Sequence, residues 1–229
     1  SDGPAARLMT LGARLAHQTK GLVTVGIHPS RPETGYGYIQ VNDEHVPAQA
    51  QFPSFSEFEL RDVFSVRRFA EKPDIDTARR FVESGDFLWN SGMFIWRLDA
   101  IDAALSEHTP EIMEQIRALP PQSDPTFTDR LHSAYSTIRG VSIDYGVMER
   151  ARNVFVLRAG ALGWSDVGSW DEVYRLSEKD MENNVLHGSH VIARNSKGSL
   201  VISRSDRLLA LYGVSDMIVI DTGDAILVS

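Results

Sequence analysis

The chain has 229 residues, of which 42% are hydrophobic, so it can bury the core of one large domain or of a large and a small one. Its 23 basic and 31 acidic side chains give a formal net charge of −8, which argues against nucleic acid or an anionic membrane as a partner, because both require a basic surface. The chain has no cysteine, which excludes disulfides, thiolate catalysis and cysteine-based metal sites, and it shows no signal peptide or membrane span, so we expect a cytoplasmic enzyme.

The first part of the chain alternates between helical and strand patterns. A helix is predicted from Pro4 to Lys20, because proline suits a first turn and leucines recur at helical spacing. Asp76 is a candidate cap for the helix that follows it, and Ser142 is a candidate cap for another. The segment 87–97 is typical of a strand, a tight turn and a second strand. The other predicted strands are 22–27, one beginning near Tyr38, 63–73 and 153–159, and the other predicted helices are 77–84, 98–107, 110–119 and one ending at Arg150.

After about residue 179 the sequence changes to short β-rich runs separated by Gly, Asn, Asp and Ser, and no helical period is found. We therefore predict an α/β domain over 1–178 and a small all-β segment over 179–229. The β segment is predicted to be a sandwich or a short solenoid.

Two short segments combine residues that suit a sugar phosphate. In PETGYGY, Gly35 and Gly37 remove side chains where a ligand could approach the backbone and Tyr36 can lie against a sugar ring, although the local sequence alone favours a tight turn. In FAEKPD, Lys72 is a compact charge suited to a phosphate, and Glu71 can accept hydrogen bonds from sugar hydroxyls. An ion pair on an edge strand explains Glu71 and Lys72 equally well.

Two further segments hold polar groups in apolar surroundings. In LWNSGMFIW, Asn90 offers a donor and an acceptor for vicinal hydroxyls, and a hairpin turn that includes Gly92 is the structural alternative. In SIDYGVMER, Asp144 lies in the first turn of a predicted helix, where the helix dipole already favours a carboxylate. The local sequence favours the structural explanation for both segments.

The segment LGWSDVGSWDEVYRL places Asp166 between Trp164 and Trp170. A carboxylate flanked by apolar groups must be paired, hydrogen-bonded or bound to a metal. A helix cap is the alternative that the local sequence favours, with Ser165 or Asp166 as the cap and Ser169 as a rival.

Taken in order, the segments RPETGYGYI, FAEKPD, WNSGMFIW, SIDYGVMER, GWSDVGSWDEVY and DMIVIDTGDAILV resemble those of the mannose-1-phosphate guanylyltransferases, a family of sugar nucleotidylyltransferases. The resemblance covers nearly the whole chain. It implies a Rossmann-like mixed α/β nucleotidyltransferase core followed by a small all-β segment similar to a left-handed β-helix turn. It also implies synthesis of GDP-mannose and pyrophosphate from GTP and mannose 1-phosphate, a need for Mg²⁺, and a homodimer.

The resemblance implies a role for each matching residue of this chain. Glu71 would bind the sugar hydroxyls, and Lys72, which we count among the catalytic groups, would bind the sugar phosphate. The other sugar-side positions that the resemblance implies are Gly35, Tyr36 and Gly37 in a loop, Asn90 and Gly92 in a turn, and Asp144 in the lining of the same pocket.

Asp166 matches the metal-binding aspartate of the family and is the second residue that we count as catalytic. We expect Trp164 and Trp170 to hold a sharp turn rigid, so that the Asp166 carboxylate is presented to magnesium and the phosphates. Such a site requires a preorganised ligand.

The sequence also departs from the family. The family's Gly-rich loop, G-x-G-x-R followed later by Pro-Lys, binds the triphosphate, and a Pro-[Ala/Ser]-Asp-His segment supplies a second metal aspartate; neither motif is found in this sequence. We therefore expect a core that is incomplete at its N-terminus, with the sugar-phosphate half present and the nucleotide half absent. We expect its sheet to have an unpaired edge and the chain alone to be inactive.

Two other functions stay open. One is a nucleotidylyltransferase for another sugar 1-phosphate or another base, because the absent segment largely selects the base. The other is a truncated paralogue that binds sugar phosphate without catalysis. An upstream reading frame that encodes the Gly-rich loop would favour the enzyme, and its absence would favour the binding protein.

Overall fold

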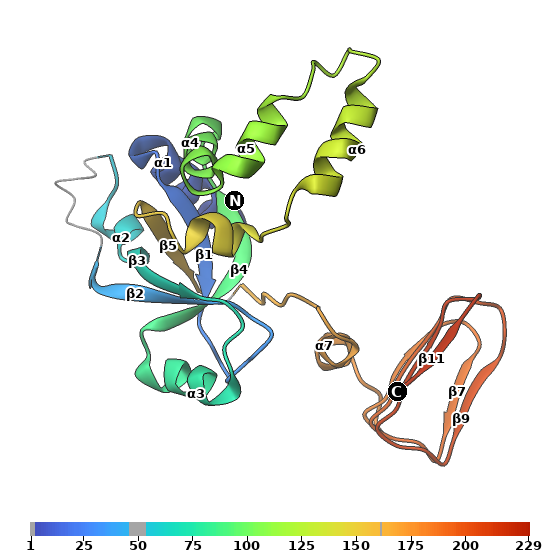
Figure 1. The fold of residues 1–229 in the computed structure, drawn as a ribbon. Helices are drawn as coiled ribbons and strands as arrows, with labels where there is room; N and C mark the ends of the chain where they lie inside the picture. The colour runs from blue at the N-terminus through green and yellow to red at the C-terminus, as the bar shows by residue number, and fades with distance from the viewer. Residues whose placement is uncertain (1–2, 46–53, 161) are drawn as a thin grey trace. The chain divides into compact units, whose positions relative to one another are not determined.

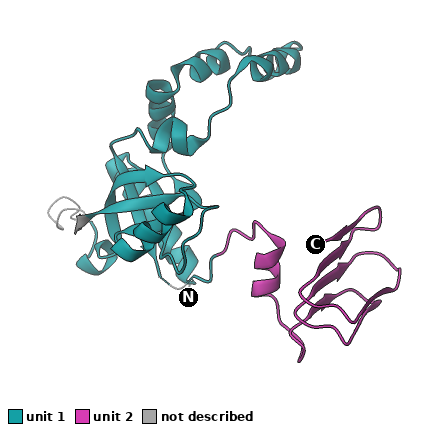
Figure 2. Ribbon diagram, turned by 60° about the horizontal axis from the view of Figure 1, so that its bottom comes forward, with its two compact units in different colours: residues 1–164 teal, residues 165–229 magenta. Residues whose placement is uncertain are grey.

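The computed structural model describes residues 3–45, 54–160 and 162–229, with the backbone alone for 43–45. The chain divides into two compact units, Ser1–Trp164 and Ser165–Ser229, which Figure 2 colours separately. No helix in the described ranges is both long enough and apolar enough to cross a bilayer. The elements of the first unit are α1 (Pro4–Thr19), β1 (Leu22–Ile27), β2 (Tyr38–His45), α2 (Glu57–Leu60), β3 (Val63–Ala70), α3 (Ile75–Ser84), β4 (Phe87–Ile95), α4 (Leu98–His108), α5 (Pro110–Arg117), α6 (Phe127–Thr137), the π-helix η1 (Asp144–Met148) and β5 (Val154–Ala159).

Five strands of the first unit form one mixed sheet whose edges meet, in the order β1-β4-β2-β3-β5 (Figure 1). β1 runs parallel to β5, with Leu22 opposite Val154, and the other pairs are antiparallel. β3 closes the sheet by pairing with β5, with Val63 opposite Leu157. The mixed α/β fold is therefore confirmed. The unpaired edge expected from the sequence is not found among the described strands, because the start of β3 occupies that edge of β5.

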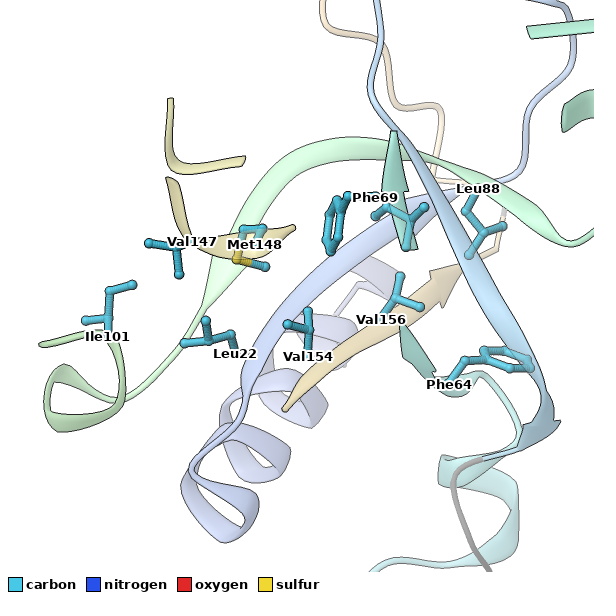
Figure 3. Packing of buried hydrophobic residues seen from close by; sticks show 10 residues of the cluster. Leu22, Phe64, Phe69, Leu88, Ile101, Val147, Met148, Val154 and Val156 are labelled. Atoms are coloured by element: carbon cyan, nitrogen blue, oxygen red, sulfur yellow. The ribbon is translucent and has the colours of Figure 1, made fainter. Parts of the chain in front are cut away.

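The largest buried cluster joins the sheet to α4 and η1 (Figure 3). Val147 and Met148 of η1 are 0% and 1% exposed, and they pack in this cluster with Leu22 of β1 and Ile101 of α4. Burial of each such side chain contributes about 1.5–3 kcal/mol relative to exposure. The core therefore fixes η1, whose first residue is Asp144.

The segment 87–97 differs from its prediction as two strands with a tight turn. β4 is one strand that passes through Asn90 without reversing, because residues on both sides of that position pair with β1. Thr24 lies opposite Phe94 and Gly26 opposite Asn90, so β4 contains extra residues between these two pairs. The irregularity is a bulge, which re-aims side chains locally.

The helix ends show where local signals were read correctly and where they were not. α3 begins two residues earlier than predicted, because Asp74 rather than Asp76 is its cap and accepts a 2.8 Å hydrogen bond from the Thr77 amide. The predicted helix of 142–150 is instead the short π-helix η1, in which the Glu149 amide reaches the Asp144 carbonyl at 2.9 Å. No helix is predicted from the sequence at α6, which forms a helical hairpin with α5 (Figure 1).

The second unit contains α7 (Trp170–Leu176) followed by short strands in repeating coils. Parallel partners lie 15 or 18 residues apart, with Val185 opposite Leu200, Val191 opposite Leu209 and Leu200 opposite Ile218, as in a solenoid. The predicted small all-β segment, with the character of a β-helix, is confirmed. The boundary predicted after residue 178 lies within this unit and stays a prediction. The strands are β6 (Val185–His187), β7 (Val191–Arg194), β8 (Leu200–Ser203), β9 (Leu209–Tyr212), β10 (Ile218–Asp221) and β11 (Ile226–Val228).

Candidate active site

The loop between β1 and β2 is held by its own aromatic and acidic side chains. The Tyr36 ring packs edge-on against Trp89 at 5.1 Å and against Trp164 at 5.7 Å between ring centroids. The Gly35 amide donates to Glu33 Oε1 at 3.1 Å. Tyr36 is thus half-buried in an aromatic cluster and stiffens the loop, which differs from an open platform for a sugar ring.

Gly37 is the point at which this loop touches the rest of the candidate site. A Cβ atom on Gly37 would lie 2.5 Å from Glu71 Oε2 and 3.4 Å from the Asn90 Cβ, so no other residue fits without displacing the carboxylate. The Gly37 carbonyl accepts a 2.7 Å hydrogen bond from the Asn90 amide. The glycine is therefore explained by close approach rather than by a turn, which was the alternative that the local sequence favoured.

Glu71 and Lys72 follow directly after β3 and differ sharply in exposure. The Glu71 side chain is 17% exposed and that of Lys72 is 65% exposed, and Glu71 Oε1 lies 3.6 Å from Lys72 Nζ. An ion pair with one partner in water contributes little to stability. Lys72 also has a left-handed backbone with φ of 44°, which is unfavourable for a lysine. Neither feature is explained by stability, and both are compatible with a ligand-binding role.

Asn90 connects three segments of the candidate site. Its backbone amide binds the loop carbonyl of Gly37, and its Nδ2 donates to Asp144 Oδ1 at 2.9 Å. Its Oδ1 accepts a 3.2 Å hydrogen bond from the Gly92 amide, at a glycine with φ of 71°. Six predicted residues thus form one chain of contacts in the first unit: Gly37, Glu71, Lys72, Asn90, Gly92 and Asp144.

Three carboxylates gather around this chain of contacts. Burial, and then the negative charge of Asp144, raise the pKa of Glu71. Burial also raises the pKa of Glu149, with further contributions from Glu71 and Asp144. Glu149 is not among the residues predicted from the sequence. In a π-helix, residues five apart lie on the same side, so the spacing from Asp144 to Glu149 indicates that the two are neighbours once a π-turn is considered. The cluster presents hydrogen-bond acceptors, which suit a ligand with many hydroxyl groups.

Trp89 is a second residue that the sequence analysis did not assign. Its side chain is 5% exposed, and its Nε1–H has no hydrogen-bond partner among the described residues. Buried indole groups usually find an acceptor. A ligand oxygen or a water molecule would satisfy this donor. Its aromatic character in an apolar strand gave no sequence signal beyond core packing.

Asp166 lies in the second unit, in the turn that precedes α7. The cap of α7 is Ser169, whose hydroxyl accepts a hydrogen bond from the Glu172 amide, so Asp166 is not used as the cap. Val167 has a left-handed backbone with φ of 49°, which a β-branched residue rarely adopts. At Gly168 a Cβ atom would lie 2.6 Å from Asp166 Oδ2, which explains the glycine.

The prediction that Trp164 and Trp170 together hold the turn at Asp166 rigid is wrong. Trp164 packs against Tyr36 in the first unit, whereas Trp170 is the 40% exposed first residue of α7. They therefore do not clamp the turn as a pair. Ser165 holds the turn instead, since its Oγ accepts a hydrogen bond from the Val167 amide at 3.2 Å.

No group of three or more His, Asp or Glu side chains within the described ranges has an arrangement that could hold a metal ion. Magnesium that is bound together with phosphates takes only one or two protein carboxylates. Asp166 is exposed, and a single exposed carboxylate fits that smaller requirement.

Comparison with known proteins places this chain in a family. A family model described as nucleotidyl transferase matches residues 7–183, and one described as the MannoseP isomerase/GMP-like beta-helix domain matches residues 189–229. The mannose-1-phosphate guanylyltransferase of Salmonella muenchen is 39% identical over 91% of this chain and 41% of its own length. That of Escherichia coli K12 is 35% identical over 100% of this chain and 46% of its own length.

A solved structure from Thermus thermophilus, titled as a mannose-1-phosphate geranyltransferase, superimposes with a TM-score of 0.77 and is 28% identical, over 99% of this chain and 60% of that chain. The chain spans less than half the length of the two curated relatives above. The match to residues 7–183 covers most of the first unit, and it includes the turn that carries Asp166. The chain belongs to the nucleotidyl transferase family.

Proposed function

We propose that this protein transfers GMP from GTP to mannose 1-phosphate, giving GDP-mannose and pyrophosphate. The observation that carries the proposal is the set of contacts in which Gly37 meets the Glu71–Lys72 pair on one side and Asn90, with Asp144, on the other. The relatives of this chain are named for this reaction. It combines acceptors for hydroxyl groups with a cation for a phosphate.

The sugar would be bound by the acidic part of this cluster. Glu71 and Asp144 offer carboxylate oxygens, and hydrogen bonds from hydroxyls to carboxylates are stronger than those between neutral groups. Asn90 fixes Asp144 at 2.9 Å, so the acceptor is positioned before the sugar arrives. Preorganisation of this kind reduces the entropy that binding costs.

Lys72 would bind the phosphate of the sugar. Its ammonium group is largely in water and 3.6 Å from Glu71 Oε1, so it can contact a phosphate without breaking a buried ion pair. A phosphate oxygen of mannose 1-phosphate then attacks the α-phosphorus of GTP in line, and pyrophosphate leaves with the electron pair of the broken P–O bond. The protein acts by positioning and by electrostatic stabilisation, and no covalent enzyme intermediate is needed.

Asp166 is the residue that we propose as a ligand of Mg²⁺. The bound ion would supply neutralisation of the charge on the transferring and leaving phosphates. The protein's own contribution is the turn around Asp166, in which Ser165 and the left-handed Val167 fix the backbone on both sides of the carboxylate. A homodimer and a cytoplasmic location stay predictions of the sequence.

The direct test is release of pyrophosphate from GTP and mannose 1-phosphate, with the 229-residue chain and the whole natural gene product assayed in parallel. Glucose 1-phosphate in place of mannose 1-phosphate, and ATP or UTP in place of GTP, address the alternative of another sugar or base. Calorimetry with mannose 1-phosphate alone addresses the non-catalytic alternative. Turnover with mannose 1-phosphate and GTP supports the proposal, and binding without turnover in both forms of the protein supports the binding paralogue.

A further inference from the structure

Thr24 places a buried hydroxyl group beneath the bulge of β4. The residue is 0% exposed, in the otherwise apolar run of β1. Its Oγ1 lies 3.3 Å from Asn90 Oδ1 and 3.2 Å from the Met93 carbonyl oxygen. A buried hydroxyl in a β-strand core costs free energy unless it is hydrogen-bonded, and the single proton of this one is shared between two acceptors that both belong to the bulge.

Ser91 provides a second hydroxyl at the same place. Its Oγ donates to the Val25 carbonyl at 2.7 Å and accepts from the Met93 amide at 3.2 Å. The regular pairing of β1 with β4 is interrupted between Thr24 and Gly26. The two hydroxyl groups therefore supply hydrogen bonds where the regular ladder shifts, and they fix the shape of the bulge.

The shape of the bulge decides which way the Asn90 amide points. The oxygen and nitrogen ends of an asparagine side chain have nearly the same size, so hydrogen bonds select its orientation. The Gly92 amide, which can only donate, faces Asn90 Oδ1 at 3.2 Å, and the Thr24 hydroxyl adds a second hydrogen bond to the same oxygen. Nδ2 is thereby turned toward Asp144. In the flipped orientation Oδ1 would face a carboxylate oxygen of Asp144, which is repulsive.

We propose that Thr24 is a positioning residue of the sugar site, which acts by fixing the Asn90 amide and through it the Asp144 carboxylate. The inference rests on the proposed function, because it assigns these groups to the sugar. Thr24 itself reaches no ligand, since it is fully buried. Its removal should therefore affect the sugar substrate and leave the nucleotide unaffected.

The test uses the full natural protein with Thr24→Val, which removes the hydroxyl and keeps the shape, and Thr24→Ser, which keeps the hydroxyl. We expect Thr24→Val to raise the Kd for mannose 1-phosphate, measured by calorimetry, by about five- to tenfold, the range of one hydrogen bond. The KM for GTP should change by less than about twofold, and Thr24→Ser should restore mannose 1-phosphate binding. The matched control is Thr19→Val, whose hydroxyl donates to the Leu15 carbonyl at the end of α1.

A second readout follows the Asn90 amide itself. In a nitrogen-edited proton NMR spectrum its side-chain NH₂ signals should shift or broaden in Thr24→Val and not in Thr19→Val. If Thr24→Val does not fold, Ser91→Ala is judged by the same two measurements. If the wild type binds mannose 1-phosphate and Thr24→Val has the same Kd and the same NH₂ signals, the role of Thr24 is wrong, and the proposed function is unaffected. A wild type that does not bind mannose 1-phosphate overturns the proposed function and this inference with it.

Discussion

The Nδ2 of Asn90 donates a 2.9 Å hydrogen bond to Oδ1 of Asp144, across 54 residues of sequence. One partner lies on the bulge of β4 and the other begins η1, whose Val147 and Met148 are buried in the core. The bond therefore ties an irregular segment to a rigid one. Irregular backbone of this kind is common at functional sites, where it aims side chains that a regular element would point elsewhere.

We predict that Asn90→Ala weakens mannose 1-phosphate binding by roughly tenfold or more, because it removes one hydrogen bond to a charged group and leaves Asp144 without its positioning donor. Calorimetry measures the change. Asn42→Ala is the matched control, since Asn42 also makes a side-chain hydrogen bond between strands, to Ser65 Oγ at 2.6 Å. Equal affinities for wild type and Asn90→Ala would remove Asn90 from the sugar site.

We predict that Lys72→Ala weakens mannose 1-phosphate binding by about one to two decades and leaves GTP binding unchanged. A charge-assisted hydrogen bond contributes about 1.5–3 kcal/mol, which corresponds to that range. Lys20→Ala is a matched control, because Lys20 and Lys72 have similar left-handed backbones, with φ of 52° and 44°. Alanine thus meets a left-handed backbone at both positions, and an unchanged Kd in Lys72→Ala would exclude the proposed phosphate contact.

We predict that Glu71→Gln raises the melting temperature at neutral pH while it weakens sugar binding. Burial, and then Asp144, raise the pKa of Glu71 in the folded protein above its ordinary 4.5, so the folded state holds this proton more tightly than the unfolded chain. The free energy of unfolding therefore falls as the pH rises from the pKa of Glu71 in the unfolded chain to its higher pKa in the folded protein. Above both pKa values Glu71 is ionised, and its charge destabilises the folded protein.

Thermal melts between about pH 4 and pH 7 test this sign. The difference in Tm, Glu71→Gln minus wild type, should be positive at neutral pH and should grow as the pH rises. Glu83→Gln on the exposed side of α3 is the control and should show no such trend. A Tm difference that stays constant or falls as the pH rises would contradict this prediction. It would show that burial of the Glu71 carboxylate does not destabilise the protein, and that no functional reason is needed for its retention.

The sequence predicted the parts of the fold that depend on local patterns. The strand 22–27 and the helix from Pro4 were found almost as expected, because a continuous apolar run and a proline-led leucine repeat are local signals. The bulge at Asn90 was read as a hairpin turn, since Asn-Ser-Gly is also a turn signal. Only the pairing of β1 with residues on both sides of it distinguishes the two, and that pairing is a long-range property.

The sequence singled out residues that the structure brings together in the candidate site, but it did not predict the contacts between them. Each predicted residue came from a quoted segment, and the reason for Gly37 became visible only when Glu71 and Asn90 were found against it. Glu149 and Thr24 were not assigned, because a glutamate near a helix end and a threonine in a strand are ordinary features. Their meaning depends on neighbours that are distant in sequence.

Asp166 is the residue whose negative charge we expect turnover to require. We expect Asp166→Asn to reduce turnover of GTP and mannose 1-phosphate by at least about 100-fold, because the amide keeps the shape and one oxygen but loses the charge that would hold magnesium. The fold should be retained, since the amide keeps the shape of the side chain and the cap of α7 is Ser169. Ser169→Ala provides the opposite pattern: it should destabilise the second unit by about 1 kcal/mol, as loss of a cap does, with a much smaller effect on turnover. Asp171→Asn, in the first turn of α7, controls for the loss of one negative charge nearby.

Turnover by Asp166→Asn close to that of wild type at ordinary magnesium concentrations, with an unchanged melt, would show that this carboxylate is not a metal ligand. A lowered melting temperature with retained turnover would instead assign Asp166 to the structure of the turn.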